Sequence, residues 1–551
     1  MERQSLPETR TAETPPSWMG AIAGMGAAAV ALAFGQFIEG ATDVPGLVLG
    51  VGEWIIDITP GWVAERSIED LGTAGKGNLL PGITIVSFLL AAGLGSFALR
   101  RGTRYGVAGF AAFGLLGGFA TARNPQSPAL ASWFWSLVAA GLGVATLIFL
   151  LNRAHASVTT PDVDDLPSPL NPPHSRRAFI GWGAGAGAVA LTGIAAGRAT
   201  MGKSAAEIAR DSTVLPAASS TSPSSTTSTT TTTEPAAGAL TDRVASVTGD
   251  TFDEISGISP WVSPSTDGQF YLIDTALSKP QVDPAKWRLS FTGMVDNPYE
   301  LSYDEILGMD LVEQTITMSC VSNEVGGSLV GNAVWTGVPL VDLLDRAGVQ
   351  EGATQVVARS VDDWTAGFPT EVLFDGRNSL LVVGMNGEPL PIRHGFPARL
   401  VVAGLYGYVS ATKWIEEINL TRWDDFNGYW VNLGWAKEGP MKTMSRIDVP
   451  RNRTRIEQGL TPVAGVAWAP TSGIESVELS IDEGPWIPCD LAIPGSDEAW
   501  VQWKLEWDAT PGIHSLQVRA HDGNGDLQPI GPKAVAPDGA EGWHQALVEV
   551  V

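Results

Sequence analysis

The chain has 551 residues, too many for a single hydrophobic core, so several domains are expected. Its formal net charge of −25 offers no counter-charge for a phosphate backbone, which excludes nucleic acid as an expected partner. Two cysteines are too few for a disulfide framework or a four-thiolate metal site, and neither lies in a Cys-x-x-Cys-His motif.

Five uncharged runs dominate the N-terminal part of the chain. They cover residues 19–38, 79–99, 105–121, 129–151 and 178–197. Each approaches or meets the roughly 20 residues that a helix needs to cross a bilayer, which predicts an all-α transmembrane block of about five helices over residues 19–200. The apolar run at 47–56 is interrupted by Glu53, which favours an interfacial or re-entrant segment.

Basic residues between the runs predict the orientation, because Lys and Arg near the ends of spans stay on the cytoplasmic side. Arg100, Arg101 and Arg104 follow the second run, and Arg176 and Arg177 precede the fifth. These loops and the N-terminus at residues 1–18 are therefore expected in the cytoplasm. The chain is predicted to be a multi-pass protein of the cell membrane, with everything after the fifth run outside the cytoplasm.

All six histidines lie outside the five runs. No pair of imidazoles is therefore available to hold a b-type haem within the bilayer, and no haem is predicted. The helices are expected to anchor the protein, and docking of a membrane redox partner or a quinone is the alternative.

The hexapeptide Ser175-Arg-Arg-Ala-Phe-Ile180 is similar to the twin-arginine motif, which directs the export of proteins that have already folded. The alternative is that Arg176 and Arg177 are ordinary cytoplasmic anchors. The export interpretation gains weight only if the exported part carries a cofactor that is inserted before export.

Composition divides the rest of the chain into a linker and two globular domains. Residues 201–250 are rich in Ser, Thr and Pro, which predicts a disordered tether. Residues 251–449 contain frequent Trp and strand-like apolar runs, which predict a globular domain. In residues 450–551 polar and apolar residues alternate with period two between turns, which predicts an immunoglobulin-like β-sandwich without an inter-sheet disulfide.

The middle domain has one cysteine, Cys320, and a lone cysteine is commonly a small buried hydrophobic residue. Its surroundings indicate more. The motifs that follow one another in order are Cys320-Val-Ser-Asn323, Trp335-Thr-Gly-Val-Pro-Leu340, Met385-Asn-Gly-Glu-Pro-Leu-Pro391, His394-Gly-Phe-Pro-Ala-Arg399 and Lys413-Trp414. In order and spacing they resemble the sulfite-oxidase family of molybdopterin-dependent oxidoreductases, in a membrane-anchored bacterial form of actinobacterial type.

The resemblance covers roughly residues 251–551, and it implies an α+β molybdopterin domain followed by the dimerisation domain of the family, hence a homodimer. It also implies a molybdenum ion held by the dithiolene of a pterin and by one protein thiolate, a position that Cys320 matches. The expected pterin and phosphate contacts are Tyr271, Asp274, Asp362, His394, Arg399, Ser410, Ala411, Thr412 and Lys413.

Two departures from the family pattern leave the substrate open. Sulfite oxidases place an Arg soon after the ligand cysteine, whereas here Asn323 is followed by Glu324, which would repel sulfite. The family's active-site Tyr is replaced by Trp364, which cannot donate a hydroxyl hydrogen bond. Asn323 and Trp364 are therefore expected to join Cys320 as catalytic residues.

We therefore expect a membrane-anchored oxidoreductase that transfers an oxygen atom and two electrons outside the cytoplasm. Its partners would be a small-molecule oxo-transfer substrate and an external or membrane redox protein. One alternative is a reductase of sulfoxides, such as protein methionine sulfoxide, on the same cofactor. The other is a non-enzymatic, tethered extracellular binding module.

Overall fold

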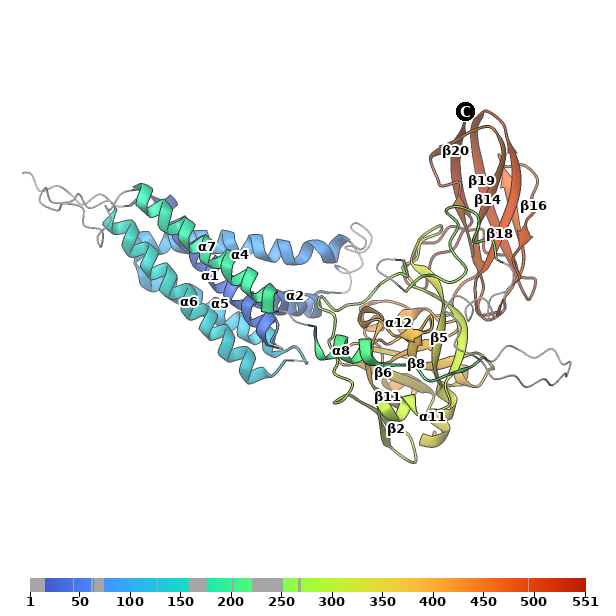
Figure 1. Cartoon of the computed structure of the whole chain (residues 1–551), viewed down its shortest axis with the longest axis horizontal. Helices are drawn as coiled ribbons and strands as arrows, with labels where there is room; N and C mark the ends of the chain where they lie inside the picture. Colours follow the sequence, from blue (N-terminus) through green and yellow to red (C-terminus); the bar gives the residue numbers. More distant parts are fainter. Residues whose placement is uncertain are drawn as a thin grey trace, which may run out of the picture. The chain divides into compact units, whose positions relative to one another are not determined.

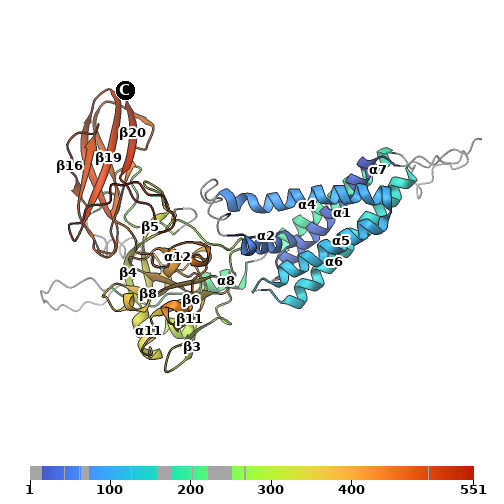
Figure 2. The same cartoon turned by 180° about the vertical axis from the view of Figure 1, so that it is seen from behind.

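The computed structural model describes residues 15–42, 44–60, 63, 74–125, 127–157, 176–200, 203–220, 251–265, 269–493 and 495–551. The chain divides into two compact units, which are considered separately. The first contains Met1–Gly202 with Ala276–Ser278, and the second contains Lys203–Thr275 with Lys279–Val551. Figures 1 and 2 show the elements of both units from opposite sides.

The first unit is helical. Its helices are α1 (Ser17–Ala41), α2 (Leu47–Ile58), α4 (Ala74–Arg101), α5 (Thr103–Ala122), α6 (Ala129–Ala156) and α7 (Arg176–Thr200). All of these except α2 are long and apolar enough to cross a membrane, so the prediction of five such helices is confirmed. The short apolar segment around Glu53 is a helix of its own, α2.

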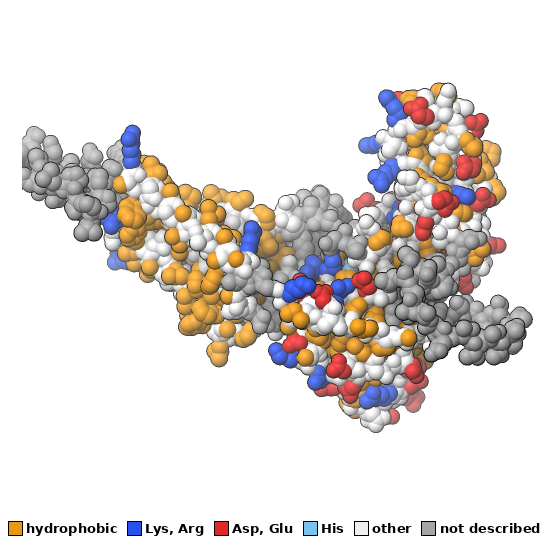
Figure 3. Space-filling model, in the orientation of Figure 1, with side chains coloured by type: hydrophobic (Ala, Val, Ile, Leu, Met, Phe, Trp, Pro, Cys, Tyr) orange, Lys and Arg blue, Asp and Glu red, His pale blue; other side chains and the backbone are white. Residues whose placement is uncertain are grey.

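Helix α1 packs against α4, α6 and α7. Small residues let α1 and α4 approach closely: a Cβ on Gly24 would lie 1.8 Å from the carbonyl oxygen of Ala91, and one on Gly20 2.6 Å from that of Gly95. Exposed apolar side chains such as Leu89 and Leu130 lie on the helices of this unit. Figure 3 shows hydrophobic side chains, in orange, over much of the visible face of the helical unit. Such a surface suits lipid rather than water.

Basic residues gather at one end of this unit. Arg100 and Arg101 end α4, Arg153 lies in the last turn of α6, and Arg177 lies in the first turn of α7. In Figures 1 and 2 these helix ends lie together, at the end where α1 begins.

One detail of the histidine prediction is wrong. Helix α6 extends to Ala156, beyond the expected end at residue 151. A basic residue such as Arg153 is favourable in the last turn, because it lies at the negative end of the helix dipole. His155 therefore lies in its last turn, where Nδ1 is 2.9 Å from the carbonyl oxygen of Leu151.

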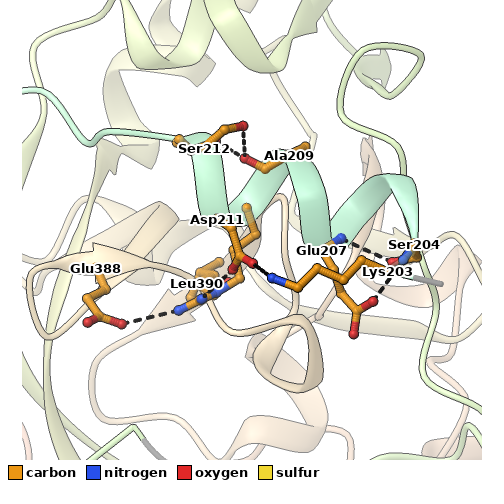
Figure 4. A network of polar contacts seen from close by, with 10 residues as sticks. Lys203, Ser204, Glu207, Ala209, Asp211, Ser212, Glu388 and Leu390 are labelled. Carbon is orange, nitrogen blue, oxygen red and sulfur yellow. Dashed lines mark hydrogen bonds and ion pairs between the residues drawn. The ribbon is translucent and has the colours of Figure 1, made fainter.

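The second unit begins inside the segment expected to be a linker. Residues 203–220 contain α8 (Ala205–Ser212) and β1 (Ser219–Ser220), and the Thr-rich residues 221–250 lie outside the described residues. A capping box starts α8: Ser204 Oγ accepts from the Glu207 N–H at 3.0 Å, and the Glu207 carboxylate accepts from the Ser204 N–H at 2.8 Å (Figure 4). Arg210 then donates to the carbonyl oxygen of Leu390 at 3.1 Å and to Glu388 at 3.2 Å.

Two sheets build the middle domain. The first has the order β1, β4 (Val312–Ser319), β5 (Val330–Pro339), β8 (Ser379–Met385) and β10 (Arg399–Val402), with β9 (Glu388–Pro389) paired to β8. The second has the order β3 (Tyr299–Ser302), β2 (Arg288–Gly293), β11 (Ile415–Thr421), β6 (Gln355–Ser360) and β7 (Thr365–Pro369). Short helices connect them: α10 (Tyr303–Leu307), η1 (Thr370–Leu373), α11 (Leu340–Ala347), η2 (Ile392–His394), α12 (Gly407–Ser410), η3 (Trp423–Asp425) and η4 (Val431–Leu433). Strands β4, β5 and β8 are buried almost throughout, and in β8 this burial explains the apolar run Leu380-Leu-Val-Val383.

Two further sheets form the C-terminal domain. One has the order β12 (Met444–Val449), β14 (Gly459–Trp468), β18 (Val501–Ala509) and β17 (Asp490–Leu491). The other has the order β13 (Thr454–Ile456), β20 (His544–Val550), β19 (Gly512–Asp522), β15 (Ile474–Ile481) and β16 (Ile487–Pro488). Val463 and Trp503 from the first sheet share a core with Leu479 and Val518 from the second, as the period-two pattern requires. Both cysteines are free thiols.

Hydrogen bonds join the C-terminal domain to β4, the strand that precedes Cys320. The Thr317 N–H donates to the carbonyl oxygen of Glu498 at 2.9 Å, and the Trp500 N–H donates to Thr317 Oγ1 at 2.7 Å. The Glu498 carboxylate, whose pKa is raised by burial, accepts from the N–H and side-chain amide of Asn378. These contacts fix the position of β4 from outside its own sheet.

Candidate functional site

Cys320 follows directly after β4 and is buried, with 8% of its surface exposed. Its N–H donates to the carbonyl oxygen of Leu329 at 2.9 Å, so the chain leaves β4, makes a loop and returns. Burial raises the pKa of the Cys320 thiol, and hydrogen bonds from Ser322 oppose that effect. The thiol is therefore protonated without a ligand, and a bound metal ion would displace its proton.

The loop after Cys320, residues 321–329, is held from three directions. Asn323 Oδ1 accepts from the Leu329 N–H at 2.8 Å, and Arg446 donates to the carbonyl oxygen of Gly327 at 2.6 Å. The His544 ring packs on Gly326, which has a φ of +76°, and a Cβ there would lie 2.2 Å from the ring. The structure thus gives Asn323 a loop-closing contact. Arg446 and His544 come from the C-terminal domain, and no motif in the sequence predicted either of them.

Arg399, the first residue of β10, is buried without a carboxylate. It is 4% exposed, and it donates to the carbonyl oxygen of His394 at 3.1 Å and that of Ala411 at 3.5 Å, with its guanidinium 5.2 Å from the Trp335 ring centroid. Within the described residues it forms no ion pair, and burial lowers its pKa to about 10. A guanidinium loses several kcal/mol of hydration free energy when it is buried, and an anion at contact distance compensates much of that loss. The position of Arg399 therefore suits an anionic ligand.

Residues 410–413 lie beside Arg399, because the Leu400 N–H donates to the carbonyl oxygen of Thr412 at 2.9 Å. The Thr412 hydroxyl is fully buried and has no hydrogen-bond partner in the structure. Lys413, whose side chain is 10% exposed, forms an ion pair with Asp274 at 2.8 Å, and burial lowers its pKa to about 8 despite that carboxylate. An unpaired hydroxyl, a lysine and a lone arginine are the donors that a phosphate group requires.

The Ser410 hydroxyl has a different role from that of Thr412. It donates to the carbonyl oxygen of Tyr406 at 3.1 Å and so closes the short helix α12 on itself. Ala411 contributes its carbonyl oxygen to Arg399. Of the expected run 410–413, the structure therefore leaves the side chains of Thr412 and Lys413 to face a ligand.

His394, at the end of η2, is 3% exposed and makes an edge-to-face contact with Phe270, with ring centroids 5.6 Å apart. Burial lowers its pKa to about 3, and the charges of Arg399 and Lys413 act in the same direction. The imidazole is therefore neutral at physiological pH and can contact a ligand as a hydrogen-bond donor or acceptor.

This neutral histidine predicts a pH-dependent stability for protein prepared without a cofactor. Because the pKa of His394 is about 3 in the folded protein and about 6.5, the ordinary histidine value, in the unfolded chain, the unfolded chain binds more protons between those values. The contribution of neutral His394 to the free energy of unfolding is fully present above pH 6.5. As the pH decreases from 6.5, this free energy decreases by at most about 1.4 kcal/mol per pH unit. His394→Gln should therefore lose less thermal stability than the parent between pH 7 and pH 5. The matched control is His521→Gln on β19, and equal losses in parent and His394→Gln would contradict the prediction.

Tyr271 connects the cysteine to the basic cluster. A Cβ on Gly407 would lie 3.8 Å from the Tyr271 hydroxyl and 3.9 Å from the carbonyl oxygen of Ser319, the residue before Cys320. The pKa of Tyr271 lies well above its usual value because the side chain is buried and close to Cys320, while Arg399 acts in the opposite direction. The structure thus brings together Cys320, Tyr271, Asp274, His394, Arg399 and residues 410–413.

Asp362 and Trp364 are placed differently. They lie in the turn between β6 and β7, where Asp362 Oδ1 accepts from the Trp364 N–H at 3.3 Å and Asp363 adopts a φ of +64°. The Val361 N–H donates to the carbonyl oxygen of Trp414 at 3.0 Å, so the turn adjoins the end of the 410–413 run. In the described part of the chain, no hydrogen bond or ring contact joins Asp362 or Trp364 to Cys320 or Arg399.

Tyr406 is a site residue that no motif in the sequence predicted. It is 4% exposed, its N–H donates to the carbonyl oxygen of Gly439 at 2.7 Å, and its hydroxyl lies 3.5 Å from the backbone nitrogen of Lys442. Burial raises the pKa of Tyr406 to about 12, and the nearby Cys320 adds to this. Its position in the chain, four residues before Ser410, was the only available signal.

One family model and several known proteins are similar to this chain. A model of the oxidoreductase molybdopterin binding domain matches residues 276–430. The uncharacterized oxidoreductase YuiH of Bacillus subtilis (strain 168) is 36% identical over 157 residues, which cover 28% of this chain and 76% of that protein. Mitochondrial sulfite oxidase of Macaca fascicularis is 27% identical over 341 residues, which cover 52% of this chain and 62% of that protein, less than two thirds of its length. Among solved structures, the sulfane dehydrogenase SoxCD from Paracoccus pantotrophus matches 59% of this chain and 94% of that chain, with 21% identity and a TM-score of 0.47.

Proposed function

Since the chain belongs to the sulfite-oxidase-like molybdopterin-dependent oxidoreductases, we propose that it transfers an oxygen atom and two electrons to or from a small substrate outside the cytoplasm. The observation that carries the proposal is the pairing of a buried thiol, Cys320, with a buried Arg399 that has no carboxylate partner among the described residues. A molybdenum–pterin cofactor, when bound, supplies two-electron oxygen-atom exchange. Membership of an enzyme family favours this reading over a tethered binding module.

The residues present fit such a cofactor. Cys320 would ligate the metal, since a thiolate is a strong donor that loses its proton on binding. Arg399, Lys413 and the Thr412 hydroxyl would hold the phosphate end, and neutral His394 would contact the pterin. Tyr271 and Asp274 would support these contacts, Asp274 by fixing the ammonium of Lys413.

Oxygen-atom transfer can run in either direction, and each direction exchanges two protons and two electrons. Sulfite and water would give sulfate, two protons and two electrons, whereas a sulfoxide, two protons and two electrons would give a sulfide and water. The electrons would pass to or from a membrane quinone pool or an external redox protein. No haem is proposed.

We also propose that the enzyme faces the outside of the cell. Arginines at the end of the helical unit where α1 begins favour a cytoplasmic position for that end, and the second unit follows the opposite end of α7. The Arg176-Arg177 pair would then serve as a twin-arginine export signal for a domain folded around its cofactor. The C-terminal sandwich, with an immunoglobulin-like fold, would form a homodimer.

Purification of the full chain from a host that makes the cofactor tests the proposal. We expect stoichiometric molybdenum by elemental analysis, together with a fluorescent oxidised pterin after denaturation. A substrate screen with an electron-accepting dye for sulfite and a reduced viologen for methionine sulfoxide should then find one turnover reaction. Protein that folds in such a host but contains no molybdenum would contradict the proposal.

A further inference from the structure

The phosphate end and the Cys320 end of the site differ in whether their cations have carboxylate partners in the protein. At the phosphate end Arg399 forms no ion pair within the described residues. At the Cys320 end, Arg446 contacts the loop 321–329, but its guanidinium already binds other groups of the protein. It pairs with Asp448 at 2.7 Å and also donates to Gly327 and to Ser259 Oγ, the latter at 2.6 Å.

A hairpin of the C-terminal domain, residues 533–541, lies close to the same end. Lys533 and Glu541 close it as an antiparallel bridge and as an ion pair of 2.8 Å. Lys442 binds it with Nζ 2.7 Å from Glu541, 3.2 Å from Asp538 and 2.9 Å from the carbonyl oxygen of Gly539. Both lysines are therefore neutralised by carboxylates of the hairpin.

Contacts place hairpin 533–541 next to the cysteine. Gly539 has a φ of +99° and lies directly against Tyr406. A Cβ on Gly539 would be only 2.6 Å from the phenol oxygen. The next residue after the hairpin, Gly542, lies against Val325 of the loop 321–329, with 3.5 Å from its Cβ position to Val325 Cγ2. Burial raises the pKa of Tyr406 to about 12, and the charges of Cys320, Asp538 and Glu541 act in the same direction.

The remaining charges in this region do not supply a free cation. Lys437 directs its ammonium to the carbonyl oxygens of Trp423 and Phe426. Glu324, in the loop after Cys320, is exposed and adds a negative charge. In the described part of the Cys320 loop, the 436–446 segment and hairpin 533–541, every Lys and Arg is thus held by a carboxylate or by backbone carbonyls.

An oxyanion such as sulfite loses hydration on entering a buried site and needs a fixed cation to replace it. A neutral S=O group needs only a hydrogen-bond donor. We propose that hairpin 533–541, through Asp538 and Glu541, together with Glu324, selects a neutral substrate of the sulfoxide class over oxyanions. This inference rests on the proposed function, and the reaction is reduction of a sulfoxide by two electrons and two protons to a sulfide and water, with a quinol as the donor class.

The test uses molybdenum-loaded full-length enzyme and two assays, sulfite with an oxidised dye and methionine sulfoxide with a reduced viologen. In the parent, kcat/KM should be higher for the sulfoxide. The double variant Glu324→Gln with Asp538→Asn removes two negative charges and leaves Lys442 with one carboxylate, so kcat/KM for sulfite should rise about tenfold, mainly through KM. The value for the sulfoxide should stay within about twofold of the parent.

The matched control is Glu300→Gln with Glu506→Gln, which removes the same charge at exposed positions on β3 and β18 and should alter neither value. Lys442→Met tests the opposite sign and should lower kcat/KM for sulfite. A parent that prefers sulfite, a loaded enzyme that reduces no sulfoxide, or a double variant that behaves like the control would each overturn the inference. Absence of molybdenum would instead defeat the proposed function.

Discussion

Cys320→Ser should fold, contain no molybdenum and lose more than about 100-fold of its oxo-transfer activity, because even residues that only support a metal ligand cost up to that much. A serine hydroxyl is nearly isosteric with the thiol, but it is far less acidic and a weaker donor to a soft or high-valent metal. Elemental analysis of the purified variant, with pterin fluorescence on the same sample, measures the loss directly.

Cys489→Ser is the matched control for this substitution. Cys489 is the other free thiol, it lies between β16 and β17 in the C-terminal domain, and burial raises its pKa to about 12. Its replacement should leave metal content and activity unchanged. Cys320→Ser protein that still holds stoichiometric molybdenum would remove the basis of the site assignment.

Arg399→Met should separate cofactor binding from folding. Without a cofactor, the substitution removes a buried charge that has no ion-pair partner among the described residues, so the thermal midpoint should stay the same or rise. With the cofactor, it would leave a buried phosphate without its main cation, which costs about 3–5 kcal/mol, or roughly 10²–10⁴-fold in affinity. Thermal unfolding of cofactor-free protein and pterin retention during dialysis measure the two effects.

Arg359→Met provides the comparison on the neighbouring sheet. Arg359 on β6 is 39% exposed and pairs with Asp363 and Glu417, so its loss should cost at most about 1 kcal/mol and no cofactor. If Arg399→Met destabilised the cofactor-free protein by several kcal/mol while retaining the pterin, Arg399 would be a structural residue.

The architecture was largely predictable because its signals are local. Length without charge identified the membrane-type helices, and alternation in segments such as β19 identified the two-sheet C-terminal domain. The exceptions are also local in origin. The segment from Lys203 to Ser220 reads as part of a polar linker, yet a capping box and one strand pairing are enough to order it on the second unit.

The candidate site was predictable where its residues share motifs. Only the residues 395–398 separate His394 from Arg399, and residues 410–413 follow β10 closely, so their proximity is fixed by short connections. His544 and Gly542 contact the Cys320 loop, and Gly539 of hairpin 533–541 contacts Tyr406, all through contacts between distant parts of the chain. No spacing rule applies to such contacts, and without the fold they could not have been predicted.

The attachment of α8 and β1 has a consequence for any shortened form of the protein. Arg210 donates to the carbonyl oxygen of Leu390, and β1 pairs with β4, so residues 203–220 fold with the second unit. A fragment that begins at residue 251 would leave β4 as an unpaired edge strand, which is a template for aggregation. A fragment that begins at residue 203 would keep that edge covered.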